Sequence, residues 1–188
     1  MRSDSVRCGC IDILVVCTGN ICRSPMGEAL LRVRLEARGV DARVHSAGTM
    51  AWGGSATDEA VRAMREHGLV IDDHRSRALT NELVDRADLV LGMTRDHVWR
   101  AARGTDDAGD RVFLVGELAR LGPRAGAREA DEPVREWAAR VAALRPGGPV
   151  GRAGDEIDDP VGEPLEVYRA TAVRLDRDLS TIASLLAP

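Results

Sequence analysis

The chain has no lysine, few aromatic residues and no cysteine after residue 22. All 26 of its basic residues are therefore arginine, and they are dispersed among the acidic residues, a pattern typical of a solvated surface. The formal net charge of -4 argues against a nucleic-acid-binding protein, which would carry a strongly basic surface. Because only 3% of the residues are aromatic, the core must be mainly aliphatic.

Long apolar runs are missing as well. The first apolar segment, 11–16, is short and contains Asp12, so no secretory signal peptide is indicated. No stretch approaches the about 20 apolar residues that span a membrane. A disulfide framework would spread its cysteines along the chain, whereas all 4 lie near the N-terminus. We therefore expect a cytoplasmic protein with a reactive thiol and no membrane partner; the oligomeric state stays open.

Strand and helix signals alternate through most of the chain. Residues 1–10 are expected to form a flexible tail and residues 11–188 a single domain with one core. Runs rich in branched apolar residues indicate strands, and capping residues and glycines delimit the helices. The expected strands are 11–16, 43–46, 88–93 and 111–115, and the expected helices are 25–38, 57–67, 80–86, 94–103, 132–144 and 165–186. This alternation predicts an α/β protein whose parallel sheet is covered by helices on both faces.

The segment from about 121 to 156 interrupts this alternation. It is rich in Ala, Arg, Gly and Pro, and residues 145–154 are expected to form a loop. An apolar stripe that includes Trp137 and Val141 supports the helix at 132–144. We interpret this segment as an insertion in the domain, which could cover the site or bind a partner.

The most informative segment reads Cys-Thr-Gly-Asn-Ile-Cys-Arg-Ser-Pro from Cys17 to Pro25. It joins a predicted strand to a predicted helix, so backbone N–H groups and the helix N-terminus can converge on an anion. Gly19 and Asn20 tolerate the left-handed backbone that such a loop needs. Arg23 can hold two phosphate oxygens with its planar guanidinium. The residues expected to bind the phosphate are Thr18, Gly19, Asn20, Ile21, Cys22, Arg23 and Ser24.

Cys17 is the expected nucleophile. Thiolate is the reactive form, and neighbouring cations, N–H groups and helix N-termini lower the pKa of such thiols to about 3.5–7.5. Ser24 can donate a hydrogen bond to the sulfur and help Cys17 leave in a second step. A Cys-x5-Arg spacing alone also fits a buried cysteine beside an unrelated arginine. The preceding strand, the Gly-Asn turn and the Ser-Pro helix start together favour the catalytic interpretation.

The segment resembles the signature of the low-molecular-weight protein tyrosine phosphatases, which read Cys-x-Gly-Asn-x-Cys-Arg-Ser-Pro. The resemblance covers about residues 11–116 and 155–186, and its further matching segments are Ser46-Ala47-Gly48-Thr49, His74-Arg75-Ser76, 87–93 and Asp159-Pro160. It implies a four-stranded parallel sheet flanked by helices, flavodoxin-like or phosphotyrosine phosphatase I-like. It further implies hydrolysis of protein phosphotyrosine through a phosphocysteine intermediate, with a phosphorylated protein as partner and no metal or organic cofactor.

The resemblance also implies roles for residues outside the loop. Asp159 matches the family's Asp-Pro loop and is expected to protonate the leaving group and then activate water. Trp52 corresponds to an aromatic pocket wall, and His74 to a histidine that hydrogen-bonds the loop asparagine, Asn20. Cys22 corresponds to a resolving thiol that protects the nucleophile from oxidation. The remaining histidines, 45, 67 and 97, are interpreted as structural or surface residues.

Two positions bear on the substrate. The family usually has an aromatic residue after Asp-Pro, and this chain has Val161, which weakens the case for phosphotyrosine. Related protein arginine phosphatases carry threonine at the position of Ile21, where isoleucine resembles the tyrosine-specific members. Since Ile21 lies inside the phosphate loop, we expect phosphotyrosine, with phosphoarginine as the alternative.

Two other functions were weighed. A thioredoxin-coupled arsenate reductase needs relay cysteines on a later segment, and this chain offers only Cys8 and Cys10, before the first strand. A phosphate-binding module without turnover would not need the set of Cys17, Arg23 and Asp159. Cys8 and Cys10 lack a second ligand pair, so no metal site is expected.

Overall fold

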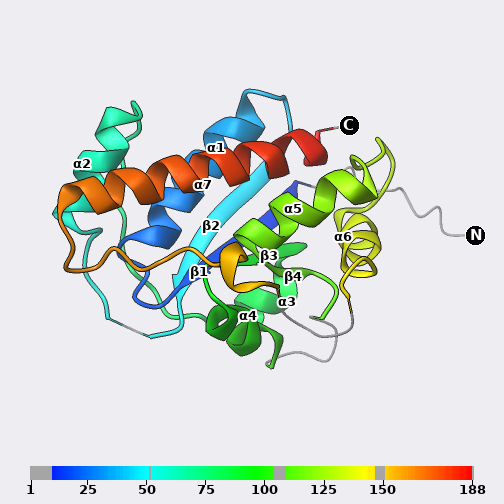
Figure 1. The fold of residues 1–188 in the computed structure, drawn as a ribbon, viewed down its shortest axis with the longest axis horizontal. Helices are drawn as coiled ribbons and strands as arrows, with labels where there is room; N and C mark the ends of the chain where they lie inside the picture. Colours follow the sequence, from blue (N-terminus) through cyan, green and yellow to red (C-terminus); the bar gives the residue numbers. More distant parts are fainter. Residues whose placement is uncertain (1–9, 51, 104–108, 147–150, 188) are drawn as a thin grey trace, which may run out of the picture.

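The computed structural model describes residues 10–50, 52–103, 109–146 and 151–187. Within these ranges, four parallel strands form one sheet in the order β2-β1-β3-β4. The strands are β1 (Ile11–Cys17), β2 (Ala42–Gly48), β3 (Leu89–Gly92) and β4 (Val112–Leu114) (Figure 1). The predicted α/β fold with a four-stranded parallel sheet is confirmed.

Helices cover both faces of this sheet. One core contains the side chains of Ile13 and Val15 of β1 together with buried residues of five helices. These helices are α1 (Arg23–Glu36), α2 (Asp58–Glu66), α5 (Val115–Ala125), α6 (Val134–Ala142) and α7 (Leu165–Leu186). The opposite core contains Leu14 and Val16 with α3 (Asn81–Arg86) and α4 (Arg95–Ala102). Because β1 is buried on both faces, its sequence is a nearly continuous apolar run.

The order of the strands places the phosphate loop. From β1 the chain moves to β2 on one side, and from β2 it crosses to β3 on the other side of β1. Ligands of such sheets bind beyond the carboxyl ends of the strands, where the direction of winding reverses. The loop between β1 and α1 lies at this position, beside the ends of β2 and β3, since Cys17 is paired with Gly48 and Val16 with Gly92.

The start of the first helix and the segment after β4 differ from what the sequence predicts. The first helix begins at Arg23 rather than Pro25, and Ser24 does not cap it; Cys22 is the residue before the helix, and the Ser24 hydroxyl contacts Cys17 instead. The chain after β4 enters α5 directly at Val115, a helix that sequence reasoning missed. Pro123 lies inside that helix, two residues before its last residue.

The remaining predictions on local structure have mixed outcomes. The helix expected at 165–186 has these bounds, and the helix expected at 132–144 is the shorter α6. The expected start of the insertion, at about 121, falls inside α5. The tail expected at 1–10 lies outside the described residues except for residue 10, as does the 147–150 part of the expected loop. The assignment of 121–156 as an insertion stays a prediction.

Candidate active site

The phosphate loop curls back on the sulfur of Cys17. Asn20 has a φ of 53°, the left-handed conformation that asparagine tolerates. This conformation directs the Asn20 backbone N–H to Cys17 Sγ at 3.3 Å. The loop then enters α1, whose N-terminal N–H groups favour an anion. A tight anion-binding turn thus lies beside the thiol.

Hydrogen bonds of Asn20 hold the loop from several directions. Its side-chain Nδ2 donates to Ser24 Oγ at 2.8 Å and to Ser46 Oγ at 2.9 Å. Its Oδ1 accepts the backbone N–H of Arg77 at 3.0 Å. His74 Nε2 donates to the Asn20 backbone carbonyl at 2.7 Å. His74 therefore contacts the asparagine, as expected, through the backbone rather than the side chain.

The surroundings of Cys17 favour its thiolate. A hydrogen bond from Cys22 is the main cause that brings the pKa of Cys17 down to about 6, and hydrogen bonds from Ser24 and the charge of Arg23 act in the same direction against the effect of burial. Ser24 Oγ lies 3.0 Å from the sulfur. Since this hydroxyl oxygen accepts from Asn20, its own hydrogen can point at Cys17. Donation to Cys17 and burial raise the pKa of Cys22.

Arg23 is buried beneath the loop, with 2% of its surface exposed. Nη1 donates to the carbonyl of Ile157 at 3.1 Å, and Nη2 approaches Thr18 Oγ1 at 3.4 Å. Nη2 also forms an ion pair with Asp159. Arg23 Nε is buried and has no hydrogen-bond partner in the part of the chain that the structure describes. The guanidinium therefore retains a donor for an oxygen ligand.

Asp159 faces the phosphate loop from the segment between η1 (Ala153–Asp155) and α7. Its carboxylate contacts Arg23 and lies 3.6 Å from Cys22 Sγ, and 41% of the side chain remains exposed. Asp155 and Glu156, which precede it, are paired with Arg120 and Arg95 on other elements. These ion pairs hold Asp155 and Glu156 away from the loop, and Asp159 is the carboxylate that contacts Cys22.

His97 also contacts the loop, although sequence reasoning gave it no role there. Its Nδ1 accepts the backbone N–H of Thr94 at 3.0 Å, so Nε2 carries the hydrogen and donates to Thr18 Oγ1 at 3.0 Å. Burial, and secondly the charge of Arg23, lower the pKa of His97 to about 4. The Thr-x-x-His spacing suggests a capping box, but no local pattern predicts the contact with Thr18.

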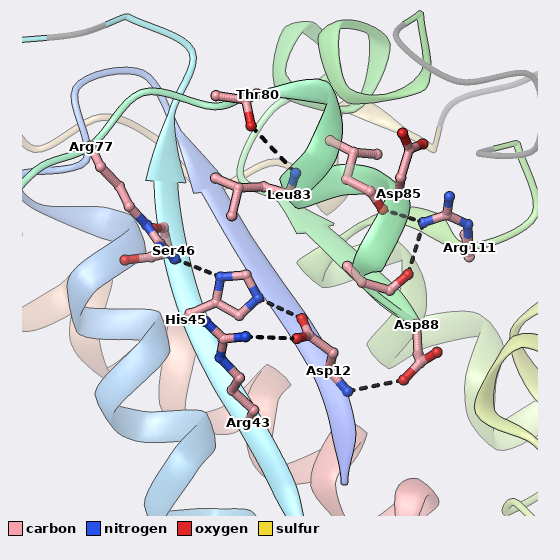
Figure 2. A network of polar contacts seen from close by, with 12 residues as sticks. Asp12, Arg43, His45, Ser46, Arg77, Thr80, Leu83, Asp85, Asp88 and Arg111 are labelled. Carbon is pink, nitrogen blue, oxygen red and sulfur yellow. Dashed lines mark hydrogen bonds and ion pairs between the residues drawn. The ribbon is translucent and has the colours of Figure 1, made fainter. Parts of the chain in front are cut away.

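Another histidine, His45 of β2, lies in a chain of polar contacts between Asp12 of β1 and Arg77 (Figure 2). Its Nε2 donates to Asp12 at 2.5 Å, and its Nδ1 accepts from Arg77 Nη2 at 2.6 Å. Arg77 Nε also donates to the carbonyl of Ser46 at 2.8 Å. These bonds fix the side chain of the same Arg77 whose backbone N–H holds Asn20. Sequence reasoning missed this support as well.

Trp52 lies against the outer side of the loop and is half-exposed. A Cβ atom at Gly19 would come within 2.5 Å of the Trp52 ring, so glycine is required for this approach. Ile21 is partly buried, and Val161, in the loop that carries Asp159, is 40% exposed. The apolar surface around the phosphate loop thus comes from a tryptophan and two aliphatic residues.

Neither a metal cluster nor a membrane span is found among the described residues. No group of three or more His, Cys, Asp or Glu side chains among them is arranged to hold a metal ion. None of their helices combines the length and the apolar character that crossing a bilayer requires.

Comparison with known proteins identifies the family. The family model for the low molecular weight phosphotyrosine protein phosphatases matches residues 12–145. A protein-arginine-phosphatase of Bacillus subtilis (strain 168) is 34% identical over 177 residues, which are 94% of this chain and 97% of the relative. A probable low molecular weight protein-tyrosine-phosphatase, EpsP, of Ralstonia nicotianae is 55% identical over 107 residues, 56% of this chain and 71% of the relative.

Solved structures agree with this result. The low molecular weight protein tyrosine phosphatase from T. tengcongensis superposes with a TM-score of 0.72 at 31% identity, covering 94% of this chain and 99% of that one. A mutant of YwlE from Bacillus subtilis gives a TM-score of 0.70 at 32% identity, with coverage of 93% and 97%. The chain therefore belongs to the low molecular weight phosphotyrosine protein phosphatase family and is a cysteine-based phosphatase.

Proposed function

We propose that the protein hydrolyses phosphorylated proteins with Cys17 as nucleophile, Arg23 as phosphate ligand and Asp159 as general acid and base. The observation that carries this proposal is the convergence of three groups at the end of β1. These are a thiol with a pKa of about 6, a buried guanidinium with an unpartnered Nε, and a carboxylate in contact with both Arg23 and Cys22. A cytoplasmic location, where thiols stay reduced, fits this chemistry.

The reaction proceeds in two steps. The Cys17 thiolate attacks phosphorus, the P–O bond to the leaving group breaks, and protonated Asp159 delivers its proton to that oxygen. Ionised Asp159 then takes a proton from water, which attacks the phosphocysteine, and Cys17 leaves as thiolate stabilised by Ser24. A bound phosphate dianion competes with Asp159 for Arg23, because both are anions that the guanidinium binds.

Phosphotyrosine is the proposed substrate residue. The half-exposed ring of Trp52 beside Gly19 and the side chain of Ile21 offer apolar surface to an aromatic ring. Aromatic rings stack favourably on such surfaces, by about 0.5–1.5 kcal/mol beyond simple burial. Phosphoarginine is the second candidate, because the relative named protein-arginine-phosphatase matches along 94% of the chain.

We expect Asp159→Asn to slow hydrolysis of a phosphotyrosine peptide by roughly 100- to 10,000-fold, the usual contribution of a general acid. The loss should be much smaller for an ester whose leaving group is acidic, since that oxygen needs no proton. Single-turnover kinetics with both substrates measures the difference. Asp158→Asn is the matched control and should be mild. Equal losses of rate for both leaving groups would show that Asp159 is not the general acid.

A substrate panel decides between the two substrate residues. Peptides of one sequence carrying phosphotyrosine, phosphoserine or phosphoarginine are compared by kcat/KM, with arsenate reduction as a control. We expect phosphotyrosine to be preferred, and Ile21→Thr to shift the preference toward phosphoarginine. If the wild type already hydrolyses phosphoarginine better, the tyrosine assignment is wrong while the cysteine mechanism stands.

A further inference from the structure

An open groove of about 480 Å³ lies beside the phosphate loop, between α3 and α4. Its lining residues are Thr49, Leu79, Asn81, Val84, Trp99, Arg100 and Arg103. We call it the α3–α4 groove. None of the residues that line it belongs to the phosphate loop, and none is acidic. It is therefore a separate feature with a basic and partly apolar surface.

Two contacts join the α3–α4 groove to the active site. The backbone N–H of Thr49, at one border, donates to the carbonyl of Cys17 at 2.9 Å. His97 of α4 bonds Thr18 at 3.0 Å. Arg103 follows His97 by six residues, about 9 Å along a helix. An extended chain advances about 3.3–3.6 Å per residue, so about three residues cover this distance. With the step from Thr18 to His97 added, a peptide can enter the groove about three to five residues from its phosphorylated residue.

The cations of the groove are available to a ligand. Neither Arg100 nor Arg103 forms an ion pair with a carboxylate of the described residues, whereas Arg95 on the same helix is paired with Glu156. The Arg103 guanidinium stacks over the ring of Trp99 at 4.2 Å. Trp99 is itself 53% exposed. Exposed tryptophan and arginine are enriched where proteins bind partners.

We infer that the α3–α4 groove binds an acidic segment of the substrate protein that flanks the phosphorylated residue. The inference rests on the proposed function, since the segment must belong to a protein that presents its phosphate to Cys17. Carboxylates of the segment pair with Arg100 and Arg103, and its apolar side chains contact Trp99 and the partly buried Leu79. The groove thereby selects among phosphoproteins by the sequence around the phosphorylated residue, while the phosphate loop and Trp52 recognise that residue itself.

The test compares two phosphopeptides that differ only three to five residues from the phosphorylated residue, where one carries glutamates and the other glutamines. For the double variant Arg100→Gln/Arg103→Gln we expect KM for the acidic peptide to rise about three- to tenfold, the effect of two exposed ion pairs. Its kcat, the KM of the neutral peptide and hydrolysis of p-nitrophenyl phosphate should stay unchanged. High salt should erase the difference between the peptides.

Arg38→Gln/Arg62→Gln is the matched control, because it removes the same charge from exposed positions at the α1 and α2 helices that face the opposite core. An unchanged KM in the groove variant overturns the inference. An equal rise for the neutral peptide, or an equal rise in the control, overturns it too. Binding of both peptides to Cys17→Ser gives the same comparison without turnover. If the wild type fails on p-nitrophenyl phosphate, the proposed function fails and the inference with it.

Discussion

Ser24 connects the structural part of the phosphate loop to its chemistry. Its hydroxyl oxygen accepts from Asn20 at 2.8 Å and lies 3.0 Å from Cys17 Sγ. Asn20 is itself held by Arg77 and Ser46. The direction of the Ser24 hydrogen is therefore set by residues far along the chain, and a hydrogen bond of fixed direction to a thiolate is worth more than one that must reorient.

We expect Ser24→Ala to raise the pKa of Cys17 above its value of about 6. Loss of a hydrogen bond to a charged group costs about 1.5–3 kcal/mol, which corresponds to roughly one to two pH units. Less thiolate is then present at pH 6, so the midpoint of alkylation by iodoacetamide should move to higher pH. Mass spectrometry of the Cys17 peptide follows the reaction.

Ser184→Ala serves as control for this measurement, because Ser184 bonds only the carbonyl of Thr181 on α7. An unchanged midpoint in Ser24→Ala would show that Cys22 and Arg23 suffice to hold the thiolate.

At the scale of elements, α5 and α6 are integral parts of the fold. Trp137 of α6 is fully buried in the core that also contains α1 and α7, and its Nε1 donates to the carbonyl of Gly126 at 3.0 Å. Arg145, just after α6, pairs with the buried Glu117 of α5 and stacks on Phe113. The chain between 115 and 146 is thus tied to the sheet at both ends.

We expect Trp137→Ala to destabilise the protein by about 3–5 kcal/mol, the usual cost of emptying a large core site. Urea unfolding followed by far-ultraviolet circular dichroism measures this loss. Trp137→Phe should recover part of it. Trp99→Ala, on the exposed side of α4, should change stability by less than about 0.5 kcal/mol. A small loss of stability in Trp137→Ala would instead show that the domain does not depend on the packing of α6 for its stability.

At the scale of the whole molecule, strand β1 separates Cys10 from the two cysteines of the phosphate loop. Cys10 precedes β1 and is exposed, whereas Cys17 ends that strand and Cys22 lies in the buried loop beyond it. Seven residues of strand span about 23 Å, far more than the about 6 Å between Cα atoms that a disulfide bridges. Cys10 therefore cannot relay oxidation from Cys17 without unfolding the strand, which counts against Cys10 as the relay thiol of an arsenate reductase.

We expect peroxide to inactivate the enzyme through a Cys17–Cys22 disulfide and thiol reductants to restore activity. Both thiols are buried in the same curled loop, and a low-pKa thiolate is readily oxidised to sulfenic acid, which a neighbouring thiol condenses with. Cys22→Ser keeps a donor toward Cys17 and should remain active, but it should recover less after peroxide. Mass spectrometry identifies the bridge; a link from Cys17 to Cys8 or Cys10, or full recovery in Cys22→Ser, contradicts the protective role.

The sequence by itself determined the phosphate loop and most of the helices and strands. Thiol, guanidinium and the N–H groups of the turn belong to one short segment, so their proximity follows from local geometry. Local signals also predicted α2, where the Thr57 side chain accepts the N–H of Ala60. They predicted α7 with its observed ends as well. The sequence did not predict α5, because Gly122 and Pro123 in its last turns are residues that usually indicate a loop.

Only the tertiary structure decided which distant side chains meet the loop. Asp159 and His97 lie 136 and 79 positions from their loop partners Arg23 and Thr18. Arg77 holds Asn20 across 57 positions. Sequence reasoning reached Asp159 through the resemblance to a family, and it missed the contacts of His97 and Arg77. Such contacts depend on how helices and connecting segments pack around the sheet, and a local pattern of residues does not determine that packing.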